Sequence, residues 1–438
     1  MSKKESFDKM TTDILRSVRL TNLSFKIWMG FITVSFLICI YAYTIQLREG
    51  LGVAGIRDYV SWGMYISNFV FFVATSLIGM LISAVLGLSG IKWAAPLARI
   101  AEIIALAFAM VAGLVIVSDM GRPERLAYVF IYGRIQSPIL WDVTVVTTYV
   151  AISALLLYLP LIPDLKICYD RLENIPKLQR NIYKWLSLDW SGSPEQIKIV
   201  RRSVRILLIL IIPVAMGIHT VTSWLFAATT RTGWDSTIFG PYFVSGAFVS
   251  GCAAVIIAMF VYRKTYHLDK YITEFHFDKM GRLLVLVSLV YLYFNLNEYL
   301  VPGYKMKKFD HFHLMELFSG RFALLFWGTQ LLGLVIPLIL LLFKKIRRPL
   351  PMLVIAIFVL AGAWLKRLLI VVPTMENPYL PIQNVPLNFK FYTPTLIETA
   401  ITLASIFLVL IIITVLSKVV PIIPIQEIEL DEHESESV

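Results

Sequence analysis

The chain has 438 residues, of which 58% are hydrophobic and 16% are charged, whereas ordinary soluble domains are about 45–50% apolar and about 25% charged. The apolar residues fall in runs long enough to cross a bilayer, which excludes a chain of ordinary soluble domains. The net charge of +11 could indicate nucleic-acid binding, but the basic residues lie in loops that flank the apolar runs. We therefore expect the lipid bilayer as a partner and no nucleic acid.

Ten segments are apolar and long enough to cross about 30 Å of hydrocarbon. In chain order they are 25–47, 60–86, 95–117, 138–162, 204–228, 239–262, 281–301, 320–343, 350–372 and 396–418. With the N-terminus inside, the inner loops and tails carry more Lys and Arg than the outer loops, so both termini are predicted to be cytoplasmic. The expected fold class is an all-α integral membrane protein, with ten transmembrane helices in a membrane domain at 25–418.

A faint internal repeat divides this domain. The second and sixth segments both begin with a glycine, any residue and a tyrosine, at Gly63–Tyr65 and at Gly240–Tyr242. We therefore predict two four-helix bundles, one at about 60–228 (helices 2–5) and one at about 239–372 (helices 6–9), flanked by helices 1 and 10. Chance is the rival explanation, because the repeat is three residues deep.

The segments outside the membrane domain are predicted to be cytoplasmic. They are the basic N-terminal segment 1–24 and the acidic tail 419–438, which we expect to be solvated and disordered. The longest loop, 163–203, also lies inside. It is basic and partly amphipathic, which favours a segment lying on the lipid headgroups.

Metal and haem sites are not indicated by the sequence. The three cysteines, Cys39, Cys168 and Cys252, lie far apart, without the paired spacing of zinc or iron–sulfur sites. A b-type haem needs two axial histidines at matching depth, and His219 is the only histidine inside a predicted span. We expect no metal, haem or iron–sulfur cluster in this chain, so any electrons must pass directly to a partner.

Titratable side chains inside the spans are the main functional signal, because a charge in the membrane is costly unless it finds a partner or water. Asp142 lies four residues inside the outer end of its span, about 6 Å at 1.5 Å per residue. It shares a helix face with Tyr149, and His219 on the next span shares a face with Ser223. This pattern predicts a hydrogen-bonding pocket near the outer surface. The alternative for His219 is an ordinary buried histidine.

The other charged residues inside the spans are candidates for a proton path. They are Glu102, Arg205, Glu298, Lys366, Arg367 and Glu398. Most of them lie in the outer half of the membrane, and only Glu102 and Arg205 belong to the inner half. The alternative for Lys366 and Arg367 is that they extend to the lipid headgroups. If Glu102 and Arg205 line an inner path linked to the outer pocket, turnover in vesicles should move protons.

Two outer loops add polar groups beside this pocket. The loop after the third span reads SDMGRPERLAYVFIYGR, and its tight turn holds Asp119 and Arg122 near the membrane surface. The loop after the fifth span contains Trp234, which we interpret as an interfacial anchor because tryptophan is common at that depth. A quinone suits the pocket, since its headgroup needs hydrogen bonds at both carbonyls and a route for two protons. Asp142 or His219 could exchange those protons.

Four motifs carry a resemblance to a known family. They are GRPERL after the third span, Trp141 with Asp142 at the start of the fourth, HTVTSWLFA in the fifth, and GWDSTIFGPYFVSGAFVSG leading into the sixth. Together they resemble the NrfD/polysulfide reductase (PsrC-like) membrane subunits, and among these the ten-helix members such as the quinol-binding subunits of alternative complex III. The likeness covers about residues 50–260.

This resemblance implies a menaquinone or ubiquinone site at the outer side, within the first bundle. It also implies an extracytoplasmic ferredoxin-like iron–sulfur subunit, often with a molybdopterin or multihaem cytochrome c subunit, at a bacterial inner membrane. By motif position the catalytic residues would be Asp142, His219 and Asp119. Candidate quinone contacts are Tyr149, Arg122, Ser223 and Trp141. The sequence departs from the family where relatives often have histidine at Asp119, an acidic residue at Leu225 and histidine at Asp235.

We therefore expect a quinone-reactive subunit of an oxidoreductase complex rather than a complete enzyme. One alternative is a proton-coupled secondary transporter, which predicts broken helices and substrate groups near the middle of the membrane. The other is a passive membrane anchor for peripheral subunits. It predicts that removing the charges of Asp142 and His219 changes stability but not the rate.

Overall fold

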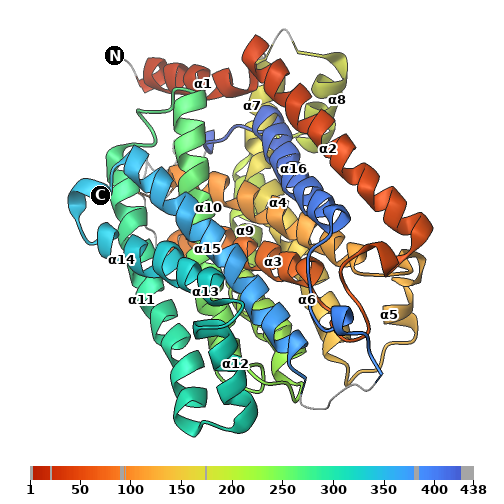
Figure 1. The fold of residues 1–438 in the computed structure, drawn as a ribbon. Helices are drawn as coiled ribbons and strands as arrows, with labels where there is room; N and C mark the ends of the chain where they lie inside the picture. The colour runs from red at the N-terminus through yellow and green to blue at the C-terminus, as the bar shows by residue number, and fades with distance from the viewer. Residues whose placement is uncertain are drawn as a thin grey trace.

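The computed structural model describes residues 3–19, 22–88, 93, 95–172, 175–378 and 384–425. Within these residues the protein contains helices and no strands, which confirms the predicted all-α fold. Figure 1 shows long helices packed side by side, with shorter helices at the two ends of the molecule.

The long helices correspond to the ten predicted spans. They are α2 (Leu23–Glu49), α3 (Met64–Leu88), α4 (Ala95–Ser118), α6 (Pro138–Tyr158), α9 (Pro194–Ala227), α10 (Phe239–Thr265), α11 (Glu274–Lys305), the consecutive α13 (Ala323–Gln330), η4 (Leu331–Val335) and α14 (Ile336–Leu341), α15 (Pro349–Glu376) and α16 (Leu396–Val419). In the described part of the chain, nine helices are long and apolar enough to cross a membrane, and α3 adds a shorter apolar stretch, Met64–Leu77. The fold is therefore consistent with ten membrane-spanning helices.

Among the helix boundaries that differ from the prediction, two have clear local reasons. Helix α9 begins at Pro194, whereas its apolar span was predicted from 204. Ser193 caps the helix by accepting a hydrogen bond from the Gln196 amide (3.3 Å), and proline is favourable at the first helical position. Helix α6 ends at Tyr158 instead of 162, because Pro160 has no amide hydrogen with which to continue the helix.

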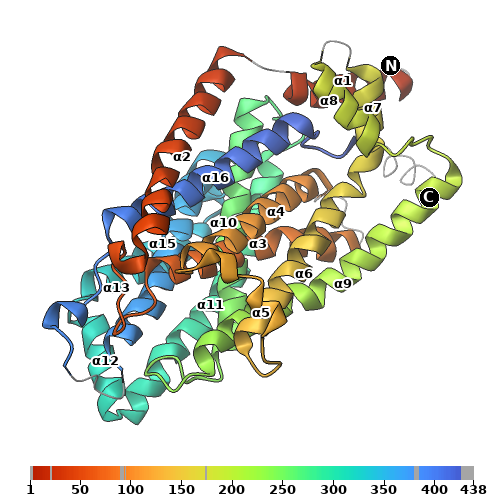
Figure 2. The same cartoon turned by 90° about the vertical axis from the view of Figure 1, so that its right-hand side faces the viewer.

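Short helices cover the two ends of the molecule, and the two views in Figure 1 and Figure 2 agree on this placement. At the predicted inner end lie α1 (Lys3–Arg19), α7 (Leu161–Arg171) and α8 (Lys177–Leu186), and at the predicted outer end lie α5 (Tyr128–Ile131) and α12 (Lys308–Phe318). Short turns of helix complete the connections: η1 (Leu51–Val53), η3 (Pro123–Arg125), η5 (Lys344–Ile346) and η6 (Leu387–Phe389). On α8, Leu178 and Trp185 are exposed, as a helix resting on lipid headgroups requires.

Helix α10 connects two groups of helices. One group is α3, α4, α6 and α9, which pack against one another, and α10 packs against both α3 and α9. Helix α10 also packs against α11 and α15. Helices α2 and α16 pack together, and α16 contacts α4. These contacts do not separate the helices into two bundles, so that division stays a prediction.

Both predicted cytoplasmic ends are partly packed against the helices. Helix α1 contacts α16 and buries Ile14 and Leu15. Ile423 and Ile425, at the start of the predicted tail, are fully buried. The Ile425 amide donates a hydrogen bond to Asp164 Oδ2 (3.3 Å). The acidic residues that follow, from 426 to 438, lie outside the described residues.

Candidate functional site

Asp142 is a buried acid at the predicted outer end of α6, four residues after the helix begins at Pro138. Its Oδ1 accepts a hydrogen bond from Thr222 Oγ1 on α9 (2.5 Å). Within the described part of the chain, no cationic side chain forms an ion pair with this carboxyl group. Among the described residues, the acid is therefore held by a neutral hydroxyl and not by a salt bridge.

His219 lies three residues before Thr222 on α9, so the two side chains share one face of that helix. The imidazole is 2% exposed. Its Nε2 has no hydrogen-bond partner among the residues that the structure describes. A buried polar atom left without a partner costs about 1–3 kcal/mol. Such an atom is a candidate hydrogen-bonding group for a bound molecule.

Tyr149 and Ser223, which the sequence suggested as quinone contacts, are buried and already make internal hydrogen bonds. The Tyr149 hydroxyl donates to the carbonyl of Ser76 on α3 (2.8 Å). Ser223 Oγ donates to the carbonyl of Thr220 one turn earlier (2.6 Å). Tyr149 thus joins α6 to α3, and a role for either residue in quinone binding stays a prediction.

Trp141 and Arg122, the other two suggested quinone contacts, lie at the surface. Trp141 is 39% exposed, and its indole N–H donates to the carbonyl of Ile135. Its ring packs edge to face against Trp224, with the ring centroids 6.2 Å apart. Arg122 is exposed in the loop after α4. Both residues therefore differ in burial from the neighbouring Asp142.

Asp119 follows directly after the last residue of α4. Its Oδ1 is buried and has no hydrogen-bond partner in the described structure. Burial, assisted by the negative charge of Glu398, raises the pKa of the Asp119 carboxyl group from an ordinary value of 3.8 to about 7. No hydrogen bond joins Asp119 to Asp142 within the described ranges. The structure therefore does not pair these two acids.

Glu398 has a clear structural environment. It completes a capping box at the start of α16, where its Oε2 accepts from the Thr395 amide (2.9 Å). The same oxygen accepts from the Gly55 amide (2.8 Å), and Oε1 accepts from the Tyr392 hydroxyl (2.8 Å). These bonds tie the segment before α3 to the start of α16. A role for Glu398 in proton transfer stays a prediction.

Glu298, Lys366 and Arg367 form a second buried polar group. Lys366 Nζ donates to Glu298 Oε2 (2.7 Å) and to the Tyr299 hydroxyl, and the Lys366 side chain is only 4% exposed. The Arg367 residue is 2% exposed, and its guanidinium lies 5.0 Å from the centroid of the Phe243 ring. Both cations are therefore buried in protein. The alternative that they extend to the lipid headgroups is wrong.

The predicted inner half of the membrane domain contains an ion pair that the sequence analysis missed. Arg99 Nη1 lies 3.1 Å from Asp164 Oδ2, and both side chains are 1% exposed. The signal was present, since Arg99 lies inside the predicted span 95–117. Glu102 is buried, whereas Arg205 is exposed. This placement gives no support to a path that joins Arg205 to Glu102.

Trp234 was predicted to anchor the outer loop at the membrane interface, and this prediction is wrong. The residue is 1% exposed. Its Nε1 donates to the carbonyl of Ile370 on α15 (2.7 Å), and its ring packs edge to face on Phe226 at 5.0 Å. The loop after α9 folds inward at this point, because the indole gains both a hydrogen bond and aromatic contacts there.

Fold and site together define the class of the protein: a multi-helix integral membrane protein with an acid, an imidazole and hydroxyl groups buried between its helices. A family model described as "Polysulphide reductase, NrfD" matches residues 52–376. The chain therefore belongs to the NrfD polysulphide reductase family, as its motifs predicted. The match extends well beyond the motif-bearing region of about 50–260.

Three curated proteins are similar to this chain. A putative membrane subunit of dimethyl sulfoxide reductase from Halobacterium salinarum is 27% identical over 327 residues, covering 73% of this chain and 70% of the relative. A selenate reductase subunit from Mesobacillus selenatarsenatis is 24% identical over 395 residues, covering 87% and 90%. An integral membrane subunit of menaquinone reductase from Nitratidesulfovibrio vulgaris is 30% identical over 141 residues, covering 32% and 33%. By name, all three are subunits of reductases.

Proposed function

We propose that this chain is the quinone-reactive membrane subunit of a respiratory oxidoreductase complex, and that Asp142 and His219 bind the quinone headgroup between α6 and α9. The observation that carries the proposal is the unpartnered Nε2 of buried His219, one helical turn from the hydroxyl that holds Asp142. The menaquinone reductase subunit among the relatives supports the same ligand class.

The chemistry of the two side chains suits a quinone. A quinone headgroup has two carbonyl oxygens, and its two-electron reduction takes up two protons. Thr222 takes only Oδ1 of Asp142, which leaves Oδ2 to hydrogen-bond the headgroup. His219 Nε2 is a second hydrogen-bonding atom on the same side of α9. Carboxyl and imidazole groups can both donate or accept the protons during turnover.

Electrons must leave or enter through a partner subunit. We propose an extracytoplasmic ferredoxin-like iron–sulfur subunit next to the outer end, with a molybdopterin or multihaem cytochrome c subunit beyond it. The names of the dimethyl sulfoxide and selenate reductase relatives support a multisubunit reductase. The basic inner loops support cytoplasmic termini in a bacterial inner membrane.

The direct test is Asp142→Asn, which keeps the size of the side chain but removes its titratable group. We expect quinol-dependent electron transfer to or from the partner subunit to fall by about 100-fold or more, because general acid–base catalysis typically contributes that much. The complex should still assemble, as measured by co-purification of its subunits.

Asp170→Asn is the matched control, since Asp170 is an exposed aspartate on α7 at the opposite end of the molecule. It should leave turnover unchanged. If Asp142→Asn retains full turnover, the Asp142 carboxyl group is not part of the quinone site. Normal turnover in variants of both Asp142 and His219, with altered stability only, would favour a passive anchor.

A further inference from the structure

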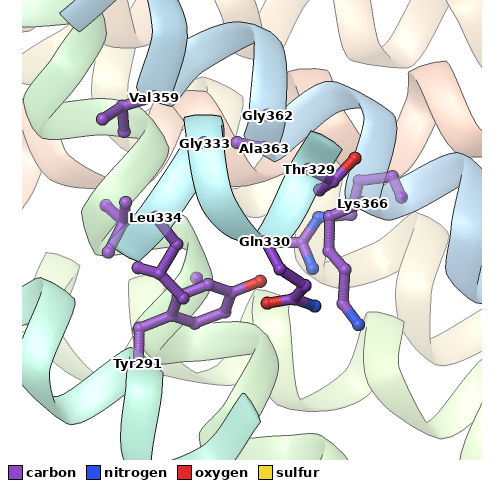
Figure 3. Close-up of a pocket in the computed structure, with 12 residues that line it drawn as sticks. Tyr291, Thr329, Gln330, Gly333, Leu334, Val359, Gly362, Ala363 and Lys366 are labelled. Carbon is purple, nitrogen blue, oxygen red and sulfur yellow. The ribbon is translucent and has the colours of Figure 1, made fainter. Parts of the chain in front are cut away.

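A small cavity lies between α10, α11, α15 and the consecutive α13 and η4. Its volume is about 20 Å³, which is enough to hold a water molecule or a small ion. The polar side chains that line it are Tyr291, Thr329, Gln330, Lys366 and Arg367. Figure 3 shows Gln330 and Lys366 running side by side, with Thr329 above them and the Tyr291 ring next to Gln330.

The charges around this cavity do not balance. Lys366 is paired with Glu298 at 2.7 Å. Arg367 is as deeply buried, but its Nε and Nη1 have no hydrogen-bond partner among the described residues. An arginine cannot shed its proton inside a protein, and the Phe243 ring beneath it offers only the weak attraction of an aromatic face. Among the described residues, one positive charge therefore remains without a counter-charge in a membrane interior, where such a charge is costly.

A second unpartnered group also lines the cavity. Thr329 is 5% exposed, and its Oγ1 makes no hydrogen bond within the described structure. The Gln330 amide next to it is already engaged, since its Oε1 accepts from Asn295 Nδ2 (2.6 Å). Thr329 and Arg367 thus present donors that other protein groups do not use. Donors of this kind, together with a positive charge, suit an anion.

Glycines shape the space around the guanidinium. A Cβ atom on Gly246 of α10 would lie 2.9 Å from Arg367 Nη2, so a larger residue there would have to displace the guanidinium. A Cβ atom on Gly333 would lie 2.7 Å from the Cα of Gly362, so η4 and α15 cross with their backbones almost in contact. This close crossing keeps the cavity small.

We propose that this cavity binds one small monovalent anion of about the size of chloride, held by Arg367 and Thr329 with Lys366 close by. The anion supplies the counter-charge that the described residues around Arg367 lack. A cavity of this size favours a small ion over a larger anion such as phosphate. Neither Asp142 nor His219 lines this cavity, so anion binding there can be measured separately from quinone-linked turnover.

The test is equilibrium binding of radiolabelled chloride to the purified full-length protein, in a buffer with gluconate as the other anion. We expect one saturable site per chain in the unmodified protein. Arg367→Gln should weaken chloride binding by at least 100-fold, because it removes the charge. Thr329→Val should weaken it by about tenfold, because it removes one hydrogen-bond donor and keeps a similar shape.

Arg282→Gln is the control, since Arg282 is an exposed arginine on α11 that pairs with Asp278; it should bind chloride normally. Replacing gluconate with chloride should also raise the thermal midpoint of the unmodified protein by several degrees and leave that of Arg367→Gln unchanged. If the unmodified protein shows no saturable chloride binding, as expected for a cavity that holds water, the proposal is overturned. If Arg367→Gln does not fold, equal chloride binding in Thr329→Val and in the unmodified protein would overturn the proposal.

Discussion

Two buried polar groups in this protein are built in opposite ways. Between α6 and α9, Asp142 accepts a hydrogen bond from a neutral hydroxyl, and His219 keeps an unpartnered nitrogen. Between α11 and α15, Lys366 and Glu298 form a close ion pair beside the second cation, Arg367. Among the described residues, the first group has no fixed counter-charge, whereas the second holds two cations and one carboxylate.

The difference shows how burial alone does not reveal a reactive group. A buried acid held by a neutral partner can change its protonation state with modest reorganisation around it. A buried ion pair resists such a change, because removing either charge leaves the other one unpaired in a medium of low polarity. We therefore propose proton exchange for the group around Asp142 and a fixed electrostatic role for the group around Lys366.

The largest expected effect is on stability, from Glu298→Gln in the second group. It leaves two buried cations without a carboxylate, so we expect the free energy of unfolding to fall by about 3–5 kcal/mol. The double variant Glu298→Gln/Lys366→Met should recover most of the loss, because both partners become neutral. Denaturant unfolding of the purified protein measures both changes. A double variant as unstable as the single one would contradict the fixed ion pair.

The effect of His219→Gln in the first group, on turnover, is expected to be smaller when both effects are expressed as free energies. Glutamine keeps a hydrogen-bonding side chain but cannot titrate, so quinol-linked turnover should fall by about 100-fold, while the unfolding free energy changes by about 1 kcal/mol or less. His267→Gln is the control, since His267 is exposed outside the long helices. If turnover and stability fell together in His219→Gln, the two groups would not differ as proposed.

The smallest effect concerns Asp119, whose pKa is raised to about 7. The folded protein then keeps a proton that the unfolded chain loses near pH 4, so this contribution to stability is full below pH 4 and disappears as the pH rises through 7. We expect Asp119→Asn to make the free energy of unfolding less dependent on pH between pH 4 and 7. At pH 8 the substitution should raise that free energy by about 1 kcal/mol, a modest value because Asp119 is partly exposed. Thermal unfolding across this pH range measures the change, with Glu124→Gln as the control. If Asp119→Asn leaves the pH dependence of stability unchanged, the Asp119 carboxyl group has an ordinary pKa.

Much of the fold could be predicted from the sequence, because long apolar runs fix the number and place of the helices in a membrane. The burial of Asp142 and His219 could be predicted for the same reason. The pairing of Lys366 with Glu298 could not, since contacts between distant helices depend on how each helix is rotated and tilted. Trp234 shows a second limit: an aromatic residue in a loop fits the membrane interface as well as it fits a buried contact.

The contact between the Ile425 amide and Asp164 has a practical consequence for protein engineering. Asp164 also holds Arg99, and Arg99 in turn donates to the carbonyl of Pro421 (3.5 Å). The last described stretch of the chain is thus hydrogen-bonded to the ends of both α4 and α7. Reporter or affinity tags should be joined beyond Ile425. Truncating the chain at Val419 would remove these hydrogen bonds and expose the buried ion pair between Arg99 and Asp164.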